Sequence, residues 1–212
     1  MNDFIILCAA DKNRFNADFN HRTYADTHQY QYNFKIRKDV FNKSFIKIIS
    51  ILEAFDLGYN KILCLDDDAF FVDLNWHCTE IFQKYNESLI VTRSPRKMKN
   101  PPLFNAGVMF LRKSRKTEEF LKKSLDTTQK ELADQWNSDK FGIMSGVEQP
   151  RLILQSFKIL KDDVKLVDYP GFNGRRKNFA FNTPIVHFVS RNKEINIQKF
   201  QKKTGINLYE LG

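Results

Sequence analysis

The stretch Leu63-Cys64-Leu65-Asp66-Asp67-Asp68-Ala69-Phe70-Phe71 decides how this chain is interpreted. A short apolar run leads directly into three adjacent carboxylates and then becomes apolar again. Adjacent carboxylates repel one another, and burying even one without a partner is expensive. The stretch therefore predicts a positive partner at this point, and a divalent metal ion is the simplest candidate.

The spacing of the three acids gives them different directions. In an extended backbone, Asp66 and Asp68 point to the same side and can share one ion. Asp67 points to the other side and needs a different partner. The alternative is an ordinary acidic turn after a strand. The apolar residues on both sides favour the metal site.

Length and composition describe a globular protein with a basic surface. The 212 residues suit one domain with a sizeable core. Lys and Arg outnumber Asp and Glu by 34 to 25, which gives a net charge of +9. This excess suits an anionic partner, whether a nucleotide, a phospholipid surface, an acidic glycan or nucleic acid, and does not choose among them.

The cysteines and the N-terminus indicate a reducing compartment. Cys8, Cys64 and Cys78 have no motif spacing, so they predict neither a disulfide framework nor a zinc site. Cys8 and Cys64 lie inside apolar runs and are expected to be buried thiols. The N-terminus has no basic segment before its short apolar run, and no run reaches the length of a membrane span. We expect a cytoplasmic protein, with peripheral association at the inner membrane face left open.

The first half of the chain alternates between two kinds of pattern. Apolar runs predict strands at residues 4–10, 30–36, 61–65 and 89–92. Helix-compatible segments fall at residues 20–30, 45–55 and 76–85. This order predicts an α/β fold with a mostly parallel central sheet flanked by helices. Such sheets bind ligands at the carboxyl ends of their strands, where the aspartates and Ala10-Asp11 lie.

The second half contains the remaining segments of interest. We expect further strands at residues 104–111, 164–167 and 184–189, and helices within 114–136 and 151–157. The strand at 104–111 opens with Asn105-Ala106-Gly107, whose small residues leave room for another group to approach the backbone closely. Polar or basic segments lie at residues 93–102, 171–182 and 194–212, and the last of these can form one helix.

Five segments of the chain carry a family resemblance through their order along the sequence. They are Asn20–Tyr30, Lys47–Asp68, Phe104–Leu111, Glu148-Gln149 and His187-Phe188. Together they cover most of the chain and resemble the metal-dependent GT-A glycosyltransferases. The chain is most similar to the galactosyl/xylosyl/mannosyl transferase family, glycosyltransferase family 34, with family 8 as the next closest. Gln29 stands where family 34 usually has Gly.

The resemblance implies a GT-A, Rossmann-like nucleotide-diphospho-sugar transferase fold over residues 1–212. Residues 1–92 would form a nucleotide-binding half, residues 93–193 a donor and acceptor half, and residues 194–212 a tail. It also implies a hexosyl or pentosyl transferase that retains anomeric configuration. The donor would be a nucleotide-sugar, usually UDP-linked.

The resemblance also implies roles for single residues. Asp66, Asp68 and His187 would hold Mn²⁺ or Mg²⁺, and their mixed oxygen and imidazole set suits Mn²⁺ better. The expected catalytic residues are Gln149, near the anomeric carbon, and Glu148, facing the acceptor. The expected donor-binding residues are Ala10, Asp11, Tyr24, Asp67, Asn105, Ala106 and Gly107.

Other interpretations of these residues stay open at this point. His187 can be an ordinary core histidine, Tyr24 can simply pack, and Glu148 can be a first-turn acid favoured by the helix dipole. The basic residues of 93–99 and 175–177 can stabilise a departing diphosphate or be solvated loops.

The expected partners are a nucleotide-sugar, a glycan, lipopolysaccharide or glycolipid acceptor, and an anionic membrane surface. No nucleic acid is expected. Three alternatives to the transferase are an aspartate-dependent phosphohydrolase, a basic nucleic-acid-binding domain and a transferase-like fold without activity. The phosphohydrolase expects Thr or Val two positions after its second Asp, where this chain has Phe70. The nucleic-acid domain lacks any recognised motif. The intact carboxylate pair argues against loss of activity.

Overall fold

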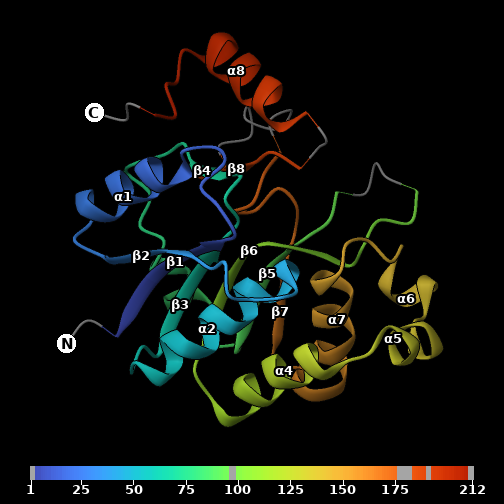
Figure 1. The fold of residues 1–212 in the computed structure, drawn as a ribbon. Helices are drawn as coiled ribbons and strands as arrows, with labels where there is room; N and C mark the ends of the chain where they lie inside the picture. Colours follow the sequence, from blue (N-terminus) through green and yellow to red (C-terminus); the bar gives the residue numbers. More distant parts are fainter. Residues whose placement is uncertain (1–2, 96–98, 176–182, 190–191, 210–212) are drawn as a thin grey trace.

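The computed structural model describes residues 3–95, 99–175, 183–189 and 192–209. Its centre is a six-stranded sheet in the order β2-β1-β3-β6-β5-β7 (Figure 1). Five of these strands run in one direction, and β6 is antiparallel to both of its neighbours. The predicted mostly parallel α/β sheet is therefore confirmed. The strands are β1 (Phe4–Ala10), β2 (Gln31–Ile36), β3 (Lys61–Leu65), β5 (Leu89–Arg93), β6 (Phe104–Arg112) and β7 (Val164–Val167).

Helices cover both faces of this sheet, because the side chains of each buried strand alternate between the two faces. Ile5 and Leu7 of β1 belong to a core with residues of α2, α4 and α7, whereas Phe4 and Ile6 pack with residues of α1 and α3. The helices are α1 (Ala17–Thr27), η1 (Lys43–Phe45), α2 (Ile46–Asp56), α3 (Glu80–Lys84), α4 (Arg115–Asp126), α5 (Gln129–Gln135), α6 (Ser138–Phe141), α7 (Glu148–Gln155), the π-helical η2 (Ser156–Leu160) and α8 (Lys193–Thr204).

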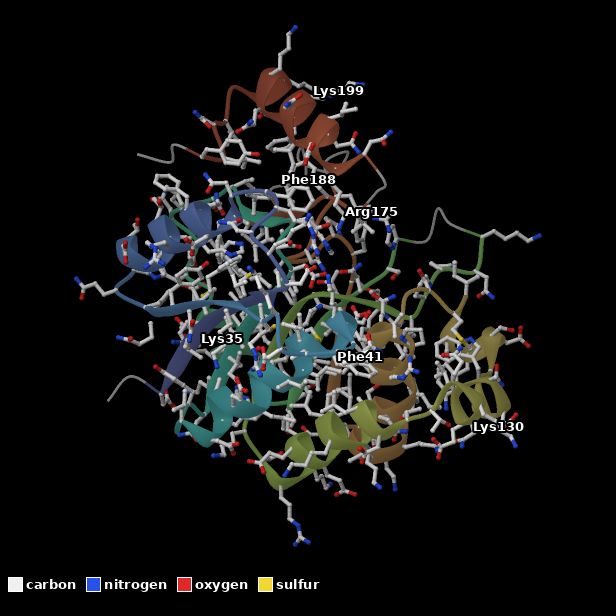
Figure 2. The ribbon with its side chains drawn as sticks, in the orientation of Figure 1. Lys35, Phe41, Lys130, Arg175, Phe188 and Lys199 are labelled. Atoms are coloured by element: carbon white, nitrogen blue, oxygen red, sulfur yellow. The ribbon has the colours of Figure 1, made fainter. Side chains whose placement is uncertain are left out.

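A second, two-stranded sheet lies beside the central one. β4 (Ala69–Phe71) pairs antiparallel with β8 (Ile185–His187), so that Ala69 lies opposite His187. A third apolar cluster fastens α8 to this small sheet, with Phe188 between them (Figure 2). The pairing brings the last predicted strand next to the three aspartates, because Ala69 directly follows them and His187 lies 118 positions later in the sequence.

Two helical predictions differ from the structure. The segment 114–136 forms two helices, because the Thr128 side chain caps the backbone N–H of Glu131 while the Glu131 carboxylate accepts from Thr128. Within 76–85, only Glu80–Lys84 is helical. The predicted segments 93–102, 171–182 and 194–212 each lie partly outside the described residues.

Candidate functional site

The first and third aspartates form one side of the site, at the carboxyl end of β3. The backbone N–H of Asp66 donates to the Gly107 carbonyl, and the N–H of Ala69 donates back to the Asp66 carbonyl, which closes a turn. The chain then enters β4. The backbone here is a turn rather than the expected extended strand, but it still brings Asp66 and Asp68 to one side.

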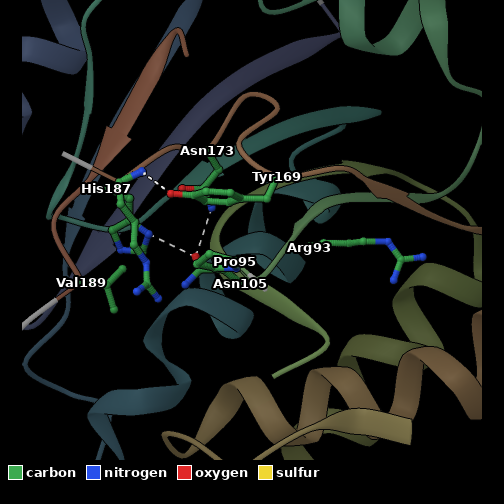
Figure 3. A pocket seen from close by; sticks show the side chains of 8 residues that line it. Arg93, Pro95, Asn105, Tyr169, Asn173, His187 and Val189 are labelled. Carbon is green, nitrogen blue, oxygen red and sulfur yellow. Dashed lines mark hydrogen bonds between the residues drawn. The ribbon is translucent and has the colours of Figure 1, made fainter. Parts of the chain in front are cut away.

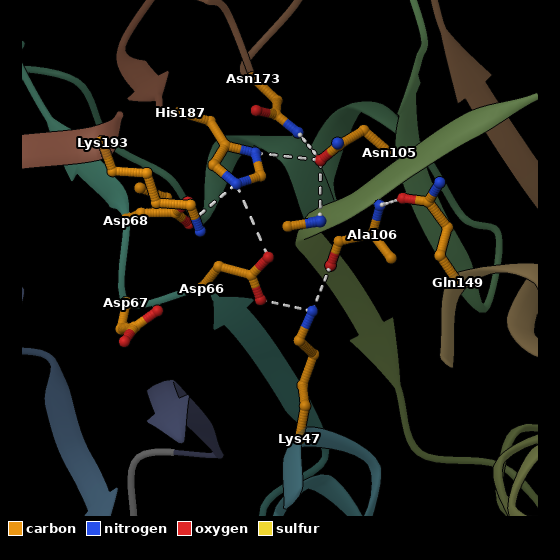
Figure 4. Close-up of polar contacts among 12 residues, drawn as sticks. Lys47, Asp66, Asp67, Asp68, Asn105, Ala106, Gln149, Asn173, His187 and Lys193 are labelled. Carbon is orange, nitrogen blue, oxygen red and sulfur yellow. Dashed lines mark hydrogen bonds and ion pairs between the residues drawn. The ribbon is translucent and has the colours of Figure 1, made fainter. Parts of the chain in front are cut away.

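His187 completes the group from the opposite strand. Its Nε2 atom lies 3.0 Å from Asp68 Oδ1 and 3.6 Å from Asp66 Oδ2 (Figure 4). Asp66, Asp68 and His187 each offer one ligand atom, and these three atoms lie within 4.8 Å of one another. The residues that the sequence predicted as metal ligands are thus brought together.

The Asn105 side chain fixes the orientation of the imidazole. Asn105 Oδ1 accepts from the Gly107 N–H at 2.8 Å and from Asn173 Nδ2 at 3.1 Å, so this atom is the amide oxygen. His187 Nδ1 lies 3.1 Å from the same oxygen. Because an amide oxygen only accepts, Nδ1 donates to Asn105, and Nε2 faces the carboxylates. This is the arrangement of a histidine that ligates a metal through Nε2.

Gly107 leaves the space that the imidazole ring fills. A Cβ atom at Gly107 would lie 1.9 Å from Cε1 of His187. The prediction that the small residues at 105–107 bring the backbone close to another group is therefore confirmed, and that group is the His187 ring.

Two lysines share the carboxylates with His187. Lys47 Nζ, which is buried, lies 2.5 Å from Asp66 Oδ1 and 2.9 Å from the Ala106 carbonyl. Lys193 Nζ lies 2.5 Å from Asp68 Oδ2. Burial alone would raise the pKa of Asp68, but His187 and Lys193 outweigh it and hold that pKa below its ordinary value. Burial alone would lower the pKa of Lys47, but Asp66 and Glu148 keep it above its ordinary value.

Asp67 points away from this group and has its own partner, as its spacing predicted. Arg14 Nη1 lies 3.0 Å from Asp67 Oδ2, and the same guanidinium also contacts Asp11. Lys43 Nζ binds the second oxygen of Asp11 at 3.0 Å. Burial and the adjacent Asp68 raise the pKa of Asp67, whereas the bond from Lys43 lowers the pKa of Asp11.

An open cleft of about 370 Å³ lies in front of these groups. Its volume falls within the range of about 300–1,000 Å³ that small-molecule sites occupy. Both acidic and basic side chains line it, which suits a ligand that carries both a cation and anionic groups. The lining residues are Ala9, Ala10, Asp11, Arg14, Lys43, Ser44, Lys47, Asp66, Asp67, Asp68, Glu148 and Lys193.

The remaining predicted residues divide between the cleft and its surroundings. Ala10, Asp11 and Glu148 line the cleft, and the Glu148 carboxylate lies 4.0 Å from Lys47 Nζ. The Gln149 side chain instead accepts the backbone N–H of Ala106 through Oε1.

Tyr24 lies away from the cleft. Its fully buried ring stacks on Phe71 with centroids 3.6 Å apart, and its hydroxyl donates to the Trp76 carbonyl. The structure thus gives Tyr24 a packing role and does not bring it to the other predicted donor-binding residues.

The cations of the cleft were not among the residues predicted from the sequence. We expected cations in 93–99 and 175–177, which lie partly outside the described residues. Lys47 had a readable signal, since it is the one charged residue in the apolar run 45–49. Arg14, Lys43 and Lys193 had none, because only the fold brings them to the aspartates.

A small depression adjoins the other side of His187 (Figure 3). It has room for about 10 Å³, which is on the order of one water molecule. Tyr169 lines it together with Asn105 and Asn173, and the Tyr169 hydroxyl accepts the backbone N–H of Arg175. At this size the depression offers no second ligand site.

Comparison with solved structures identifies the fold. A glycosyltransferase involved in the glycosylation of the major capsid of PBCV-1 has a TM-score of 0.71 at 15% identity, over 94% of this chain and 98% of that one. The chain has the GT-A fold. The glycosyltransferase GlyE of Streptococcus pneumoniae TIGR4 has a TM-score of 0.58 at 17% identity, over 91% of this chain and 56% of that one.

A further GT-A neighbour is the 4-diphosphocytidyl-2C-methyl-D-erythritol synthase from Anaerococcus prevotii DSM 20548. It has a TM-score of 0.52 at 9% identity, over 92% of this chain and 95% of that one. No model of a known protein family and no curated protein matches the chain. The likeness is one of fold, and membership of family 34 or family 8 stays a prediction.

The structure also bears on the predictions about the cysteines and about membrane-spanning segments. Cys8, Cys64 and Cys78 are buried free thiols, as predicted for Cys8 and Cys64. Among the described residues, every helix is too short or too polar to span a membrane.

Proposed function

We propose that this protein is a metal-dependent glycosyltransferase. It moves a hexose or pentose from a nucleotide-sugar, UDP-linked, to a glycan, lipopolysaccharide or glycolipid acceptor. The observation that carries the proposal is the grouping of Asp66, Asp68 and His187 at the carboxyl end of β3 in a GT-A fold, with Asp66 and Asp68 lining an open cleft. The phosphohydrolase and nucleic-acid alternatives gain no support from the solved structures that share this fold.

The donor set fits a divalent cation. Two carboxylates and one imidazole, with its Nε2 atom already directed at them, suit Mn²⁺ better than Mg²⁺. When bound, the ion supplies Lewis-acid stabilisation of the charge that develops on a departing diphosphate. Lys47 and Lys193 already neutralise the outer oxygens of the two carboxylates, so each carboxylate has one oxygen left that faces His187.

The basic side chains of the cleft suit the diphosphate of the donor. Arg14, Lys43 and Lys193 line the cleft, and the Lys43 and Lys193 side chains are 70% and 35% exposed. Ammonium and guanidinium groups fixed beside a leaving phosphate stabilise its growing charge. We assign this role to them in place of the segments 93–99 and 175–177.

The end of the cleft near β6 and α7 suits the sugar that is transferred. We propose that Asn105, Ala106 and Gly107 form its wall, and that Lys47 and Gln149 hold this wall through the carbonyl and the N–H of Ala106. Gln149 then lies near the anomeric carbon, and Glu148, which lines the cleft, faces the acceptor. Retention of configuration rests on the family resemblance, and we assign no nucleophile.

The opposite end of the cleft suits the nucleoside. Ala10 and Asp11 lie at the carboxyl end of β1 and line the cleft, and Asp67 holds Arg14 beside them. We leave Tyr24 out of this site, because its ring is buried against Phe71.

A thermal-shift screen tests the proposed function. UDP-, GDP- and CDP-sugars are compared with and without Mn²⁺, because a ligand that binds only the folded state raises the melting temperature with its occupancy. We expect UDP-sugars to raise it only when Mn²⁺ is present, and the protein to release UDP slowly from the donor it prefers. Release of phosphate from small phosphomonoesters, with no response to any nucleotide-sugar, would contradict the proposal.

A cytoplasmic protein that associates with an anionic membrane remains part of the proposal. The net charge of +9 supports it, because such a charge attracts the protein to anionic lipid headgroups. Sedimentation with phosphatidylglycerol vesicles, but not with neutral phosphatidylcholine vesicles, is the expected result. If the protein sediments with neither kind of vesicle, an anionic membrane is not one of its partners.

A further inference from the structure

Two buried polar side chains of α1 hold the strand that follows the aspartates. Asn20 and His21 are both fully buried, and neither reaches the cleft. We propose that Asn20 and His21 are positioning residues of the metal site, which set where Asp68 lies relative to His187. This inference rests on the proposed function, since it needs Asp68 and His187 to bind a cation.

The Asn20 carboxamide binds both polar groups of one backbone residue in β4. Its Oδ1 accepts the Phe71 N–H at 2.8 Å, and its Nδ2 donates to the Phe71 carbonyl at 3.0 Å. Nδ2 also lies 3.3 Å from the Leu208 carbonyl, in the segment after α8. One amide therefore joins α1, β4 and the segment after α8. Helix α8 in turn carries Lys193, whose ammonium group contacts Asp68.

His21 holds the other end of β4. Its Nε2 atom lies 2.7 Å from the Ala69 carbonyl, and since a carbonyl only accepts, Nε2 carries the proton. Its Nδ1 atom is buried without a hydrogen-bond partner among the described residues. Burying an unpaired nitrogen is unfavourable, so an apolar side chain would fill this space at lower cost. The bond to Ala69 is what the histidine contributes here.

The two contacts matter because of where Ala69 and Phe71 lie. Ala69 directly follows Asp68 and lies opposite His187, whose strand is paired with β4 alone among the named strands that the structure describes. The N–H of Phe188 also binds the Asp68 carbonyl at 2.9 Å. The His187 ring is also held by Asn105 of β6, and its backbone N–H by the Gly174 carbonyl. A shift of β4 therefore moves Asp68 relative to His187 and relative to Asp66, which is fixed to β6 through Gly107. Metal sites tolerate only about 0.2 Å in ligand distance.

The test measures Mn²⁺ affinity by electron paramagnetic resonance, at a temperature where circular dichroism shows each variant to be folded. His21→Leu removes the bond to Ala69, whereas His21→Gln keeps a donor near the position of Nε2. Asn20→Leu removes the contacts to Phe71. We expect His21→Leu and Asn20→Leu to weaken Mn²⁺ binding roughly tenfold or more, as other residues that orient metal ligands do, and His21→Gln to restore most of it.

Asp163→Leu is the matched control. Asp163 accepts the Ser88 N–H at 2.7 Å and the Ser88 hydroxyl at 2.5 Å, so it also holds a strand end through one side chain. It lies near the start of β5 and β7, at the amino ends of the parallel strands, whereas the aspartates lie at the carboxyl end of β3. We expect Asp163→Leu to lower the melting temperature and leave Mn²⁺ affinity unchanged.

The outcomes separate the two proposals. If wild type binds Mn²⁺ and the folded His21→Leu and Asn20→Leu variants bind it equally well, the positioning role is wrong and the metal site stands. If Asp163→Leu weakens Mn²⁺ as much as they do at an equal loss of melting temperature, the effect is one of stability and the positioning role is again wrong. If wild type binds no Mn²⁺, both fail together. Should Asn20→Leu not fold, the His21→Leu and His21→Gln pair decides.

Discussion

Gly107→Ala should disable the metal site without replacing any ligand. The added Cβ atom would lie 1.9 Å from Cε1 of His187, about 1.5 Å short of the ordinary contact distance that begins at 3.4 Å. The backbone of Gly107 does not have the positive φ that disfavours alanine, so the clash is the main effect. The ring must move, and a shift of this size far exceeds the roughly 0.2 Å that metal–ligand distances tolerate.

The expected magnitudes follow from these distances. Crowding a packed site typically costs about 1–3 kcal/mol of stability. Losing the orientation of a metal-binding histidine costs about 10- to 100-fold in metal affinity. Mn²⁺ titration followed by electron paramagnetic resonance measures the second quantity, and thermal unfolding measures the first. Gly58→Ala is the control, because its Cβ meets nothing within 4 Å and only its positive φ is strained, at about 1–2 kcal/mol.

A double-mutant cycle isolates the contact between Gly107 and His187. In a His187→Ala background the ring is absent, so Gly107→Ala should weaken Mn²⁺ binding little further. Two results would show that the contact between Gly107 and the His187 ring does not control Mn²⁺ affinity. One is a Gly107→Ala variant that binds Mn²⁺ as wild type does, and the other is a loss of affinity that is equally large with and without the His187 ring.

Three further predictions concern single side chains of the site and of α1. Asp68→Asn should abolish Mn²⁺-dependent UDP-sugar binding in calorimetry while the circular dichroism spectrum stays unchanged; undiminished binding would argue against Asp68 as a ligand. Lys193→Met should tighten binding of Mn²⁺ alone, because the ammonium 2.5 Å from Asp68 Oδ2 competes with the ion, and should weaken UDP binding; an unchanged affinity for both would remove Lys193 from the site. Burial lowers the pKa of His21 from 6.5 to about 4, so between these values the unfolded chain binds a proton that the folded chain does not. Stability should therefore fall by about 3 kcal/mol as the pH drops through this range, and His21→Gln should flatten that fall in thermal unfolding.

The central sheet was predictable because its inner strands, β1, β3, β5 and β6, are buried on both faces. Residues 4–10 and 61–65 are continuous apolar runs, and the alternation with helices predicts parallel neighbours. The direction of β6 was not predictable, since apolar runs look the same in either direction. The break at Thr128 was readable, because Thr128 and Glu131 have the spacing of a capping box.

The candidate site was predictable where its chemistry is local in sequence. Asp66 and Asp68 are two positions apart, and Asp67 between them has the separate partner that their geometry required. The proximity of His187 depended on the resemblance, because the pairing of β4 with β8 joins distant parts of the chain. Arg14, Lys43 and Lys193 reach the cleft from three separate segments. For Tyr24, an aromatic residue in a polar helix does not show whether it faces a ligand or the core.

Pulsed electron paramagnetic resonance of the Mn²⁺-loaded protein would show directly whether Asp66, Asp68 and His187 bind one metal ion. We expect one Mn²⁺ per chain, with a nitrogen coupling from one imidazole that disappears in His187→Ala. Asp66→Asn combined with Asp68→Asn should remove the bound ion. Tight Mn²⁺ binding that persists in this double variant, or a wild-type protein that binds no Mn²⁺ with or without UDP, would show that these three residues do not form a metal site.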